Sequence, residues 1–175
     1  MRKIVKLMIL ALAGYVAGYL LVKITGSYNE KKETEKKIQK LPDAQFISLT
    51  GDTVNLHDFD PGKPMIIIFF HPECDHCRYE AKEIGLNADA FQNCQMLMIT
   101  FDDSIKRIEN FCMNYHLWEI SNFEVLLDPG NHFDESFGKT AVPSIFVYSP
   151  DRKLKKKFIG ETKPEALINE TILFR

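Results

Sequence analysis

The sequence lacks a strong imbalance of charge. Its 175 residues carry a formal net charge of −2, with 22 lysines and arginines against 24 aspartates and glutamates. Nucleic-acid-binding domains usually display a basic patch or stripe, and the only concentrated basic stretch in the globular part is DRKLKKKF, residues 151–158. Lysines on a strand also discourage edge-to-edge pairing, which is the explanation we favour for this stretch. We therefore expect no nucleic-acid partner.

Cysteine is scarce, and its spacing restricts what the four thiols can do. Only Cys74 and Cys77 form a C-x-x-C pair, whereas Cys94 and Cys112 stand alone. A structural metal site usually needs four ligands, and no second pair of suitably spaced ligands accompanies this one. The spacing favours a redox pair over a metal centre, and exchange between two thiols and a disulfide requires no cofactor.

Charge is absent from one long segment near the N-terminus, Leu7 to Val22. Basic residues precede this apolar run, and Lys23 follows it. The run is slightly short for a membrane span, but lysines at its ends can reach the interface. It contains no clean A-x-A cleavage motif after a complete apolar core. We expect residues 1–25 to form an uncleaved membrane anchor, with a cleaved signal peptide as the alternative.

The basic residues before the apolar run predict the orientation of the chain. They favour the cytoplasmic side, so the chain after Val22 is expected across the cytoplasmic membrane, in the periplasm or at the cell exterior, where disulfides persist. Residues 26–40 contain eight charged residues of both signs. We expect them to be a tether that is helical in part. The Leu41-Pro42 step then marks the start of a domain, residues 41–175.

Apolar runs alternate with amphipathic segments from residue 41 onwards. Residues 44–59 indicate two short strands around a turn at Gly51-Asp52, which is a hairpin signal. Further strands are expected at 63–70, 94–100, 123–128, 144–149 and 153–160, and helices at 77–91, 102–116, 132–138 and 163–174. This order predicts an α/β fold with helices on both faces of one sheet.

The C-x-x-C pair begins a helix directly after a buried strand. Unpaired N–H groups and the positive end of the helix dipole stabilise a thiolate at the first cysteine. We therefore expect Cys74 to be the exposed attacking thiol and Cys77 the partly buried thiol that resolves a mixed disulfide. His76, if protonated, would add to the stabilisation of the thiolate. Glu80 is a candidate for proton transfer, with a solvated helix face as an equally good explanation.

The strand, the C-x-x-C helix and the later stretch AVPSIFV (141–147) resemble the thioredoxin superfamily. The resemblance implies a cis-proline loop at Val142-Pro143 that faces the cysteine pair, with backbone groups before the proline available to a bound substrate chain. The resemblance carried by residues 46–80 and 126–154 is more specific. They resemble the membrane-anchored thiol–disulfide oxidoreductases of the TlpA/ResA type, whose redoxin (AhpC/TSA-like) domain begins with an extra hairpin.

That resemblance implies a function and partners. It implies a redox-active disulfide between Cys74 and Cys77, protein disulfides or dithiols as substrates, and a reductive role such as cytochrome c maturation. A reductant outside the cytoplasm would also need a membrane electron donor. The sequence departs from the family where Trp commonly precedes the first cysteine, because Phe70 and His71 lie in that region. Redox potential and direction are therefore left open.

Two alternatives belong to the same superfamily. Peroxiredoxins place Thr or Ser three residues before the peroxidatic cysteine, where this sequence has His71. Copper-delivery proteins use C-x-x-x-C with a distant histidine, and His132 keeps a non-enzymatic, copper-binding function open.

The two remaining cysteines lie on a strand and on the helix that returns from it. That path would bring Cys94 and Cys112 to the same level, so a disulfide between them is open geometrically. We favour two buried thiols, because cysteine is among the most buried residue types.

Overall fold

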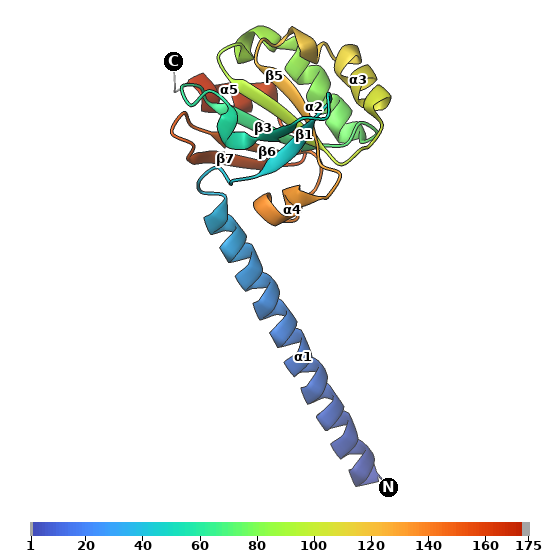
Figure 1. The fold of residues 1–175 in the computed structure, drawn as a ribbon. Helices are drawn as coiled ribbons and strands as arrows, with labels where there is room; N and C mark the ends of the chain where they lie inside the picture. Colours follow the sequence, from blue (N-terminus) through green and yellow to red (C-terminus); the bar gives the residue numbers. More distant parts are fainter. Residues whose placement is uncertain (1, 173–175) are drawn as a thin grey trace. The chain divides into compact units, whose positions relative to one another are not determined.

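The computed structural model describes residues 2–172 and divides into two compact units, one up to Lys36 and one from Lys37 onwards. The described residues of the first unit all lie in one helix, α1 (Arg2–Lys37), which Figure 1 draws without interruption. The charged segment 26–40 was predicted to be helical only in part, and it is helical as far as Lys37. An ion pair of 2.8 Å between Glu33 and Lys36 supports this continuation, because residues three apart lie on one helix face.

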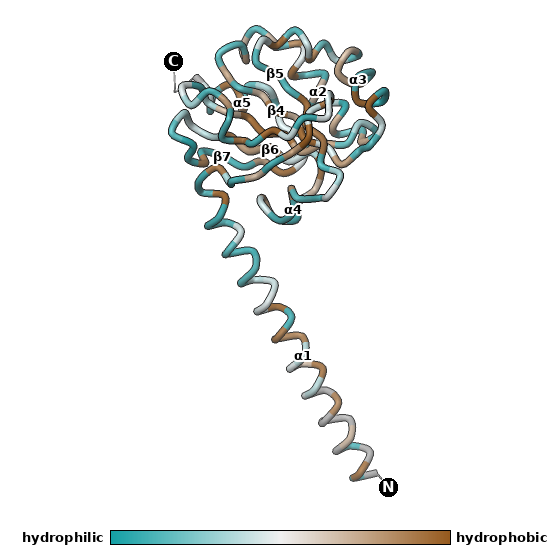
Figure 2. Tube along the Cα trace, viewed as in Figure 1, coloured by the Kyte–Doolittle hydropathy of each residue, from teal (hydrophilic) through white to brown (hydrophobic). Residues whose placement is uncertain are grey.

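The helix α1 changes character along its length. Figure 2 shows brown, hydrophobic turns in the part farther from Lys37 and mainly teal, hydrophilic turns in the part that ends there. Within residues 2–172, no helix combines the length and the apolar character that a membrane crossing requires. The predicted N-terminal helix is present as α1, and its membrane-spanning character is not shown.

The second unit begins slightly before the boundary predicted at Leu41-Pro42. Ile38 and Leu41 are both buried, and the backbone N–H of Leu41 donates to the carbonyl of Arg152 at 2.9 Å. This segment packs into the apolar core together with the side chains of the first strand. Residues 37–40 thus belong to the folded domain.

The domain is built on a seven-stranded sheet in the order β2-β1-β5-β4-β3-β6-β7. Its central strands β3, β4 and β5 run parallel, and the outer strands pair antiparallel. The predicted hairpin is confirmed as β1 and β2, with Gly51 in the turn at a φ of 93° that favours glycine. The strands are β1 (Gln45–Ser48), β2 (Thr53–Asn55), β3 (Met65–Phe70), β4 (Gln95–Thr100), β5 (Phe123–Leu127), β6 (Ser144–Tyr148) and β7 (Leu154–Ile159).

Four α-helices accompany the sheet in the described part of the domain. They are α2 (Asp75–Leu86), α3 (Ile105–Asn114), α4 (His132–Phe137) and α5 (Pro164–Ile172), with short 3-10 turns at 56–58, 88–91 and 117–119. The helix predicted from residue 102 begins only at Ile105, because the Asp102 carboxylate accepts the backbone N–H of Ser104 in a preceding turn.

Alternating side chains of the sheet form two apolar cores, which confirms the prediction that helices cover both faces. Along β3, the even-numbered residues face a core shared with α2, α3 and α5, and the odd-numbered residues face a core shared with α4 and segment 38–56. In the second core, Phe133 stacks on Phe69 with ring centroids 4.1 Å apart and on Phe137 at 4.4 Å. Strands β3 and β4 are buried throughout, so their carboxyl ends are fixed points for the loops that follow.

Candidate active site

The cysteine pair lies where β3 gives way to α2. Cys74 is the residue that immediately precedes the helix, and its backbone N–H donates to the carbonyl of His71 at 3.1 Å. Cys74 is partly exposed, whereas Cys77 is only 1% exposed and packs into the core under α2. Cys74 and Cys77 lie 3.2 Å apart, and both are free thiols. One thiol is thus accessible and the other is covered, and Cys77 is more deeply buried than predicted.

The loop before β6 faces this pair. The Val142-Pro143 peptide bond is cis, as the resemblance implied, and the Cys74 thiol donates a hydrogen bond to the Val142 carbonyl at 3.7 Å. The hydroxyl of Ser144 donates to the carbonyl of Ala141 at 2.6 Å, which ties the loop to the start of β6. The backbone before Pro143 therefore lies directly beside the accessible thiol.

Burial determines the protonation of the second cysteine. The pKa of Cys77 is raised well above that of an ordinary thiol, chiefly because burial penalises the thiolate. A backbone hydrogen bond from His71 opposes this effect, and the nearby Cys74 and Glu80 add to it. Cys77 is therefore protonated at neutral pH, and it needs a base before it can attack a disulfide.

Glu80 is a buried carboxyl group behind the pair. Its residue is 1% exposed, so the interpretation of Glu80 as part of a solvated helix face is wrong. Its Oε2 accepts the backbone N–H of Thr162 at 2.6 Å, and its Oε1 is buried without a hydrogen-bond partner among the described residues. Burial raises the pKa of Glu80 to about 7, with the Thr162 N–H acting in the opposite direction. Both protonation states of this carboxyl are thus populated near neutral pH.

His76, the other predicted supporting residue, is held at the surface. Its side chain is 70% exposed, and its Nδ1 lies 2.8 Å from Oε2 of Glu161, in the loop after β7. Within residues 2–172, the hydrogen bond of this ring is therefore to a carboxylate and not to either cysteine.

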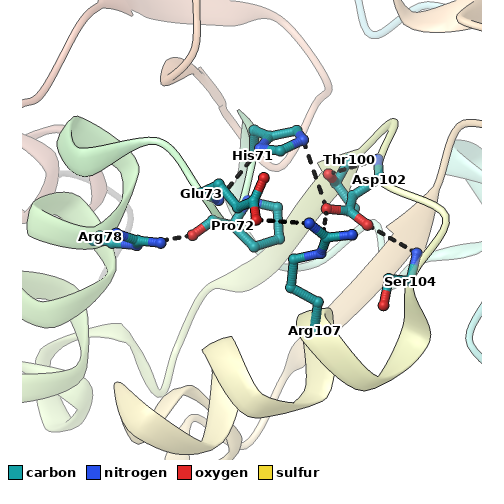
Figure 3. A network of polar contacts seen from close by, with 8 residues as sticks. All are labelled: His71, Pro72, Glu73, Arg78, Thr100, Asp102, Ser104 and Arg107. Carbon is teal, nitrogen blue, oxygen red and sulfur yellow. Dashed lines mark hydrogen bonds and ion pairs between the residues drawn. The ribbon is translucent and has the colours of Figure 1, made fainter.

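A polar network that the sequence pattern did not predict lies beside the pair and consists of His71, Glu73, Asp102 and Arg107 (Figure 3). The Nε2 atom of His71 faces Oδ2 of Asp102 at 3.6 Å, and Arg107 lies 3.1 Å from the same oxygen. The signal lay in the strand pairing, because β3 and β4 are parallel neighbours and Phe70 aligns with Thr100. Residues that follow the two strands therefore meet at one edge of the sheet.

The other candidate residues lie outside this arrangement. His132 begins α4, and its Nδ1 is 3.6 Å from Oε2 of Glu135. Cys94 and Cys112 are both buried as thiols rather than bridged, which agrees with the interpretation we favoured. In the described part of the chain, no group of three or more His, Cys, Asp or Glu residues is arranged to hold a metal ion.

Comparison with known proteins connects this geometry to thiol–disulfide chemistry. The chain is similar to the thiol-disulfide oxidoreductase ResA of Bacillus cereus, with 24% identity over 168 residues that cover 95% of this chain and 92% of the relative. It is also similar to ResA of Bacillus subtilis, with 23% identity over 141 residues, 79% of this chain and 75% of that one.

Solved structures of similar fold share the domain. A secreted Mycobacterium tuberculosis disulfide oxidoreductase homologous to E. coli DsbE has a TM-score of 0.64 at 18% identity, covering 79% of this chain and 98% of that one. StoA from Bacillus subtilis has a TM-score of 0.58 at 18% identity, covering 75% and 98%. At this level of identity the likeness shows the fold, which is thioredoxin-like as predicted. The sequence model of the AhpC/TSA family matches residues 38–157, so the chain belongs to the AhpC/TSA family.

Proposed function

We propose that the Cys74–Cys77 dithiol of this thiol–disulfide oxidoreductase reduces disulfides of protein partners outside the cytoplasm. The enzymatic class rests on relatives that are named thiol-disulfide oxidoreductases. The observation that carries the proposal is the placement of the partly exposed Cys74 thiol at the start of α2, against the Val142 carbonyl and within 3.2 Å of the buried Cys77.

The first step is attack by Cys74. Its thiolate, at the positive end of α2, attacks one sulfur of the partner disulfide, forming a Cys74–partner disulfide and breaking the partner's own S–S bond. The released partner thiolate takes a proton from solvent. The backbone groups of Val142, beside the Cys74 sulfur, are placed to bind the partner chain while this mixed disulfide exists.

The second step requires deprotonation of a buried thiol. Cys77 loses its proton and attacks the Cys74 sulfur, which forms the Cys74–Cys77 disulfide and releases the partner's second thiolate. Two electrons have then passed from the cysteine pair to the partner. Glu80 is the base we propose for the Cys77 proton, because it is buried one helical turn away and its pKa is about 7.

The proposed location rests on the N-terminal sequence. Basic residues before the uncharged run Leu7–Val22 favour an N-terminal anchor in the cytoplasmic membrane with the domain outside. An extracytoplasmic reductant becomes oxidised in each cycle, and an electron donor in the membrane would restore the dithiol. The reductive direction and the partner class are supported by the family resemblance and by the accessible thiol.

The reduction potential of the Cys74–Cys77 couple tests this function. The full chain, with Cys94 and Cys112 replaced by alanine, would be equilibrated in glutathione and dithiothreitol buffers and analysed by thiol trapping. We expect a potential below about −230 mV, nearer to thioredoxin than to the oxidases. A value above about −150 mV would overturn the reductive direction. A pair that forms no reversible disulfide but binds copper tightly would favour the non-enzymatic alternative.

A further inference from the structure

The residue at the centre of the polar network, His71, contacts the cysteine pair through its backbone. Its carbonyl accepts the N–H of Cys74 at 3.1 Å, and its backbone also hydrogen-bonds the Cys77 sulfur, where it lowers the thiol pKa. That hydrogen bond favours the ionised form of the Cys77 thiol. A single residue thus contacts both members of the pair.

The ring of the same residue is bound on both sides (Figure 3). Its Nδ1 accepts the backbone N–H of Glu73 at 3.2 Å, inside the loop that leads to Cys74. Its Nε2 faces the Asp102 carboxylate at 3.6 Å. An acceptor at Nδ1 must be unprotonated, so the geometry requires the neutral tautomer with its proton on Nε2.

The charges around the ring oppose each other. Asp102 is 2% exposed at its side chain and faces Nε2 of the ring, and its Oδ2 lies 3.1 Å from Nε of Arg107. Arg107 also pairs with Glu73, the second carboxylate near the ring, at 2.7 Å. The uncharged ring of Phe101 also packs beside the imidazole, with a centroid distance of 5.0 Å. The Asp102 carboxylate is thus paired with the guanidinium, and the Glu73 N–H takes Nδ1 of the ring as its acceptor.

We propose that His71 is a positioning residue that holds the Cys74–Cys77 pair in its reactive geometry only while its Nδ1 is unprotonated. The inference rests on the proposed function and extends it to His71, which lies in the region where the family commonly has tryptophan before the first cysteine. The neutral ring fixes the loop 71–74, so that the backbone of His71 meets both cysteines. If Nδ1 carried a proton, its N–H would face the backbone N–H of Glu73. Neither group could accept a hydrogen bond, and the bond between the ring and the loop would be lost.

Three substitutions in the full chain separate the roles of the ring. H71F keeps an aromatic ring beside Phe101 but removes the acceptor for the Glu73 N–H. H71N retains an acceptor oxygen near the Nδ1 position. Asp102→Asn keeps the oxygen that accepts the Ser104 N–H but removes the carboxylate charge facing Nε2. His116→Asn, at an exposed left-handed position that asparagine tolerates, is the matched control.

The first measurement is the rate of Cys74 alkylation by iodoacetamide, together with the reduction potential of the pair. Loss of one neutral hydrogen bond predicts a rate about 2- to 10-fold lower in H71F, and H71N should recover most of that loss. The described contacts belong to the dithiol form, so the potential of H71F should become more negative, by about 30 mV for each tenfold change in equilibrium constant.

The second measurement is the tautomer itself, read from the imidazole nitrogen shifts in long-range ¹H–¹⁵N spectra at pH 7.5. We expect Nδ1 of His71 to be unprotonated, and Asp102→Asn to weaken the preference for a proton on Nε2. A protonated Nδ1 in the wild type overturns the inference without any variant. An unchanged alkylation rate and potential in H71F would also overturn it, while a wild-type pair that still forms a reversible disulfide would leave the proposed function standing.

Discussion

The carboxylate of Glu80 accepts a hydrogen bond of 2.6 Å from the backbone N–H of Thr162, although the two residues are 82 positions apart in the chain. The loop after β7 thereby covers a helix position that would otherwise face solvent. Its Oε1 remains buried without a hydrogen-bond partner among the described residues, and the pKa of the group is about 7. A carboxyl group under such cover can hold or release a proton beside the buried Cys77 thiol.

Replacement of Glu80 by glutamine should slow the step in which Cys77 releases the mixed disulfide. A positioned general base contributes about 100-fold or more, so we expect a loss of about that size in single-turnover reduction of a model disulfide. The wild-type rate should rise as the pH passes about 7, because Glu80 becomes ionised there. Glu109→Gln, at an exposed position on α3, is the control, and an equal loss of rate in both variants would show that Glu80 is not the base.

The same carboxyl group should make stability depend on pH. The folded protein binds the Glu80 proton up to about pH 7, whereas an unfolded chain releases it near the ordinary value of 4.5. Between these two pH values the folded state thus holds more protons than the unfolded chain. The free energy of unfolding therefore falls as the pH rises through that interval. At about 1.4 kcal/mol per pH unit, the difference amounts to about 3 kcal/mol.

Urea unfolding of the wild type and of Glu80→Gln would measure this dependence. The wild type should lose stability from about pH 4.5 to about pH 7 relative to the variant, which cannot ionise at this position. Parallel pH profiles for the two proteins would show that the buried carboxyl does not titrate in this interval.

Alkylation of the folded, reduced protein should distinguish the cysteines by their burial. Cys74 is partly exposed, whereas Cys77, Cys94 and Cys112 are at most 2% exposed. Mass spectrometry after a short iodoacetamide pulse at pH 7.5 should therefore find one modified site, Cys74. Modification after unfolding provides the control for all four thiols. Equal labelling of Cys77 in the folded protein would contradict the assignment of Cys74 as the attacking thiol.

Truncation of Phe133 should destabilise the domain more than it affects the cysteine pair. This ring is fully buried on the face of the sheet opposite to α2, and it stacks on Phe69 and Phe137. Phe133→Ala leaves a cavity in this core, so the free energy of unfolding should fall by about 3–5 kcal/mol. The alkylation rate of Cys74, measured well below the melting temperature, should change little. Phe133→Leu should lose less stability, because it refills part of the cavity.

The local pattern of the sequence determined the secondary-structure elements and the position of the cysteine pair at a helix start. MIIIFF and QMLMIT contain too little polar surface to be anything but buried strands, and the C-x-x-C that follows the first of them marks a helix start. Val142-Pro143 was placed opposite the pair by resemblance to a family rather than by local physics. In each case the information lies within a few consecutive residues, where backbone preference and side-chain pattern act directly.

The tertiary structure alone decided the surroundings of those residues. Glu80 is buried because a loop from the far end of the chain covers it, and His76 is paired with Glu161 in that same loop. His71 meets Asp102 because β3 and β4 are paired in parallel with a particular register. Whether a polar side chain is solvated, paired or buried depends on which distant segment packs over it. The spacing of residues along a sequence carries no direct record of that contact, which arises only when the sheet and its loops assemble.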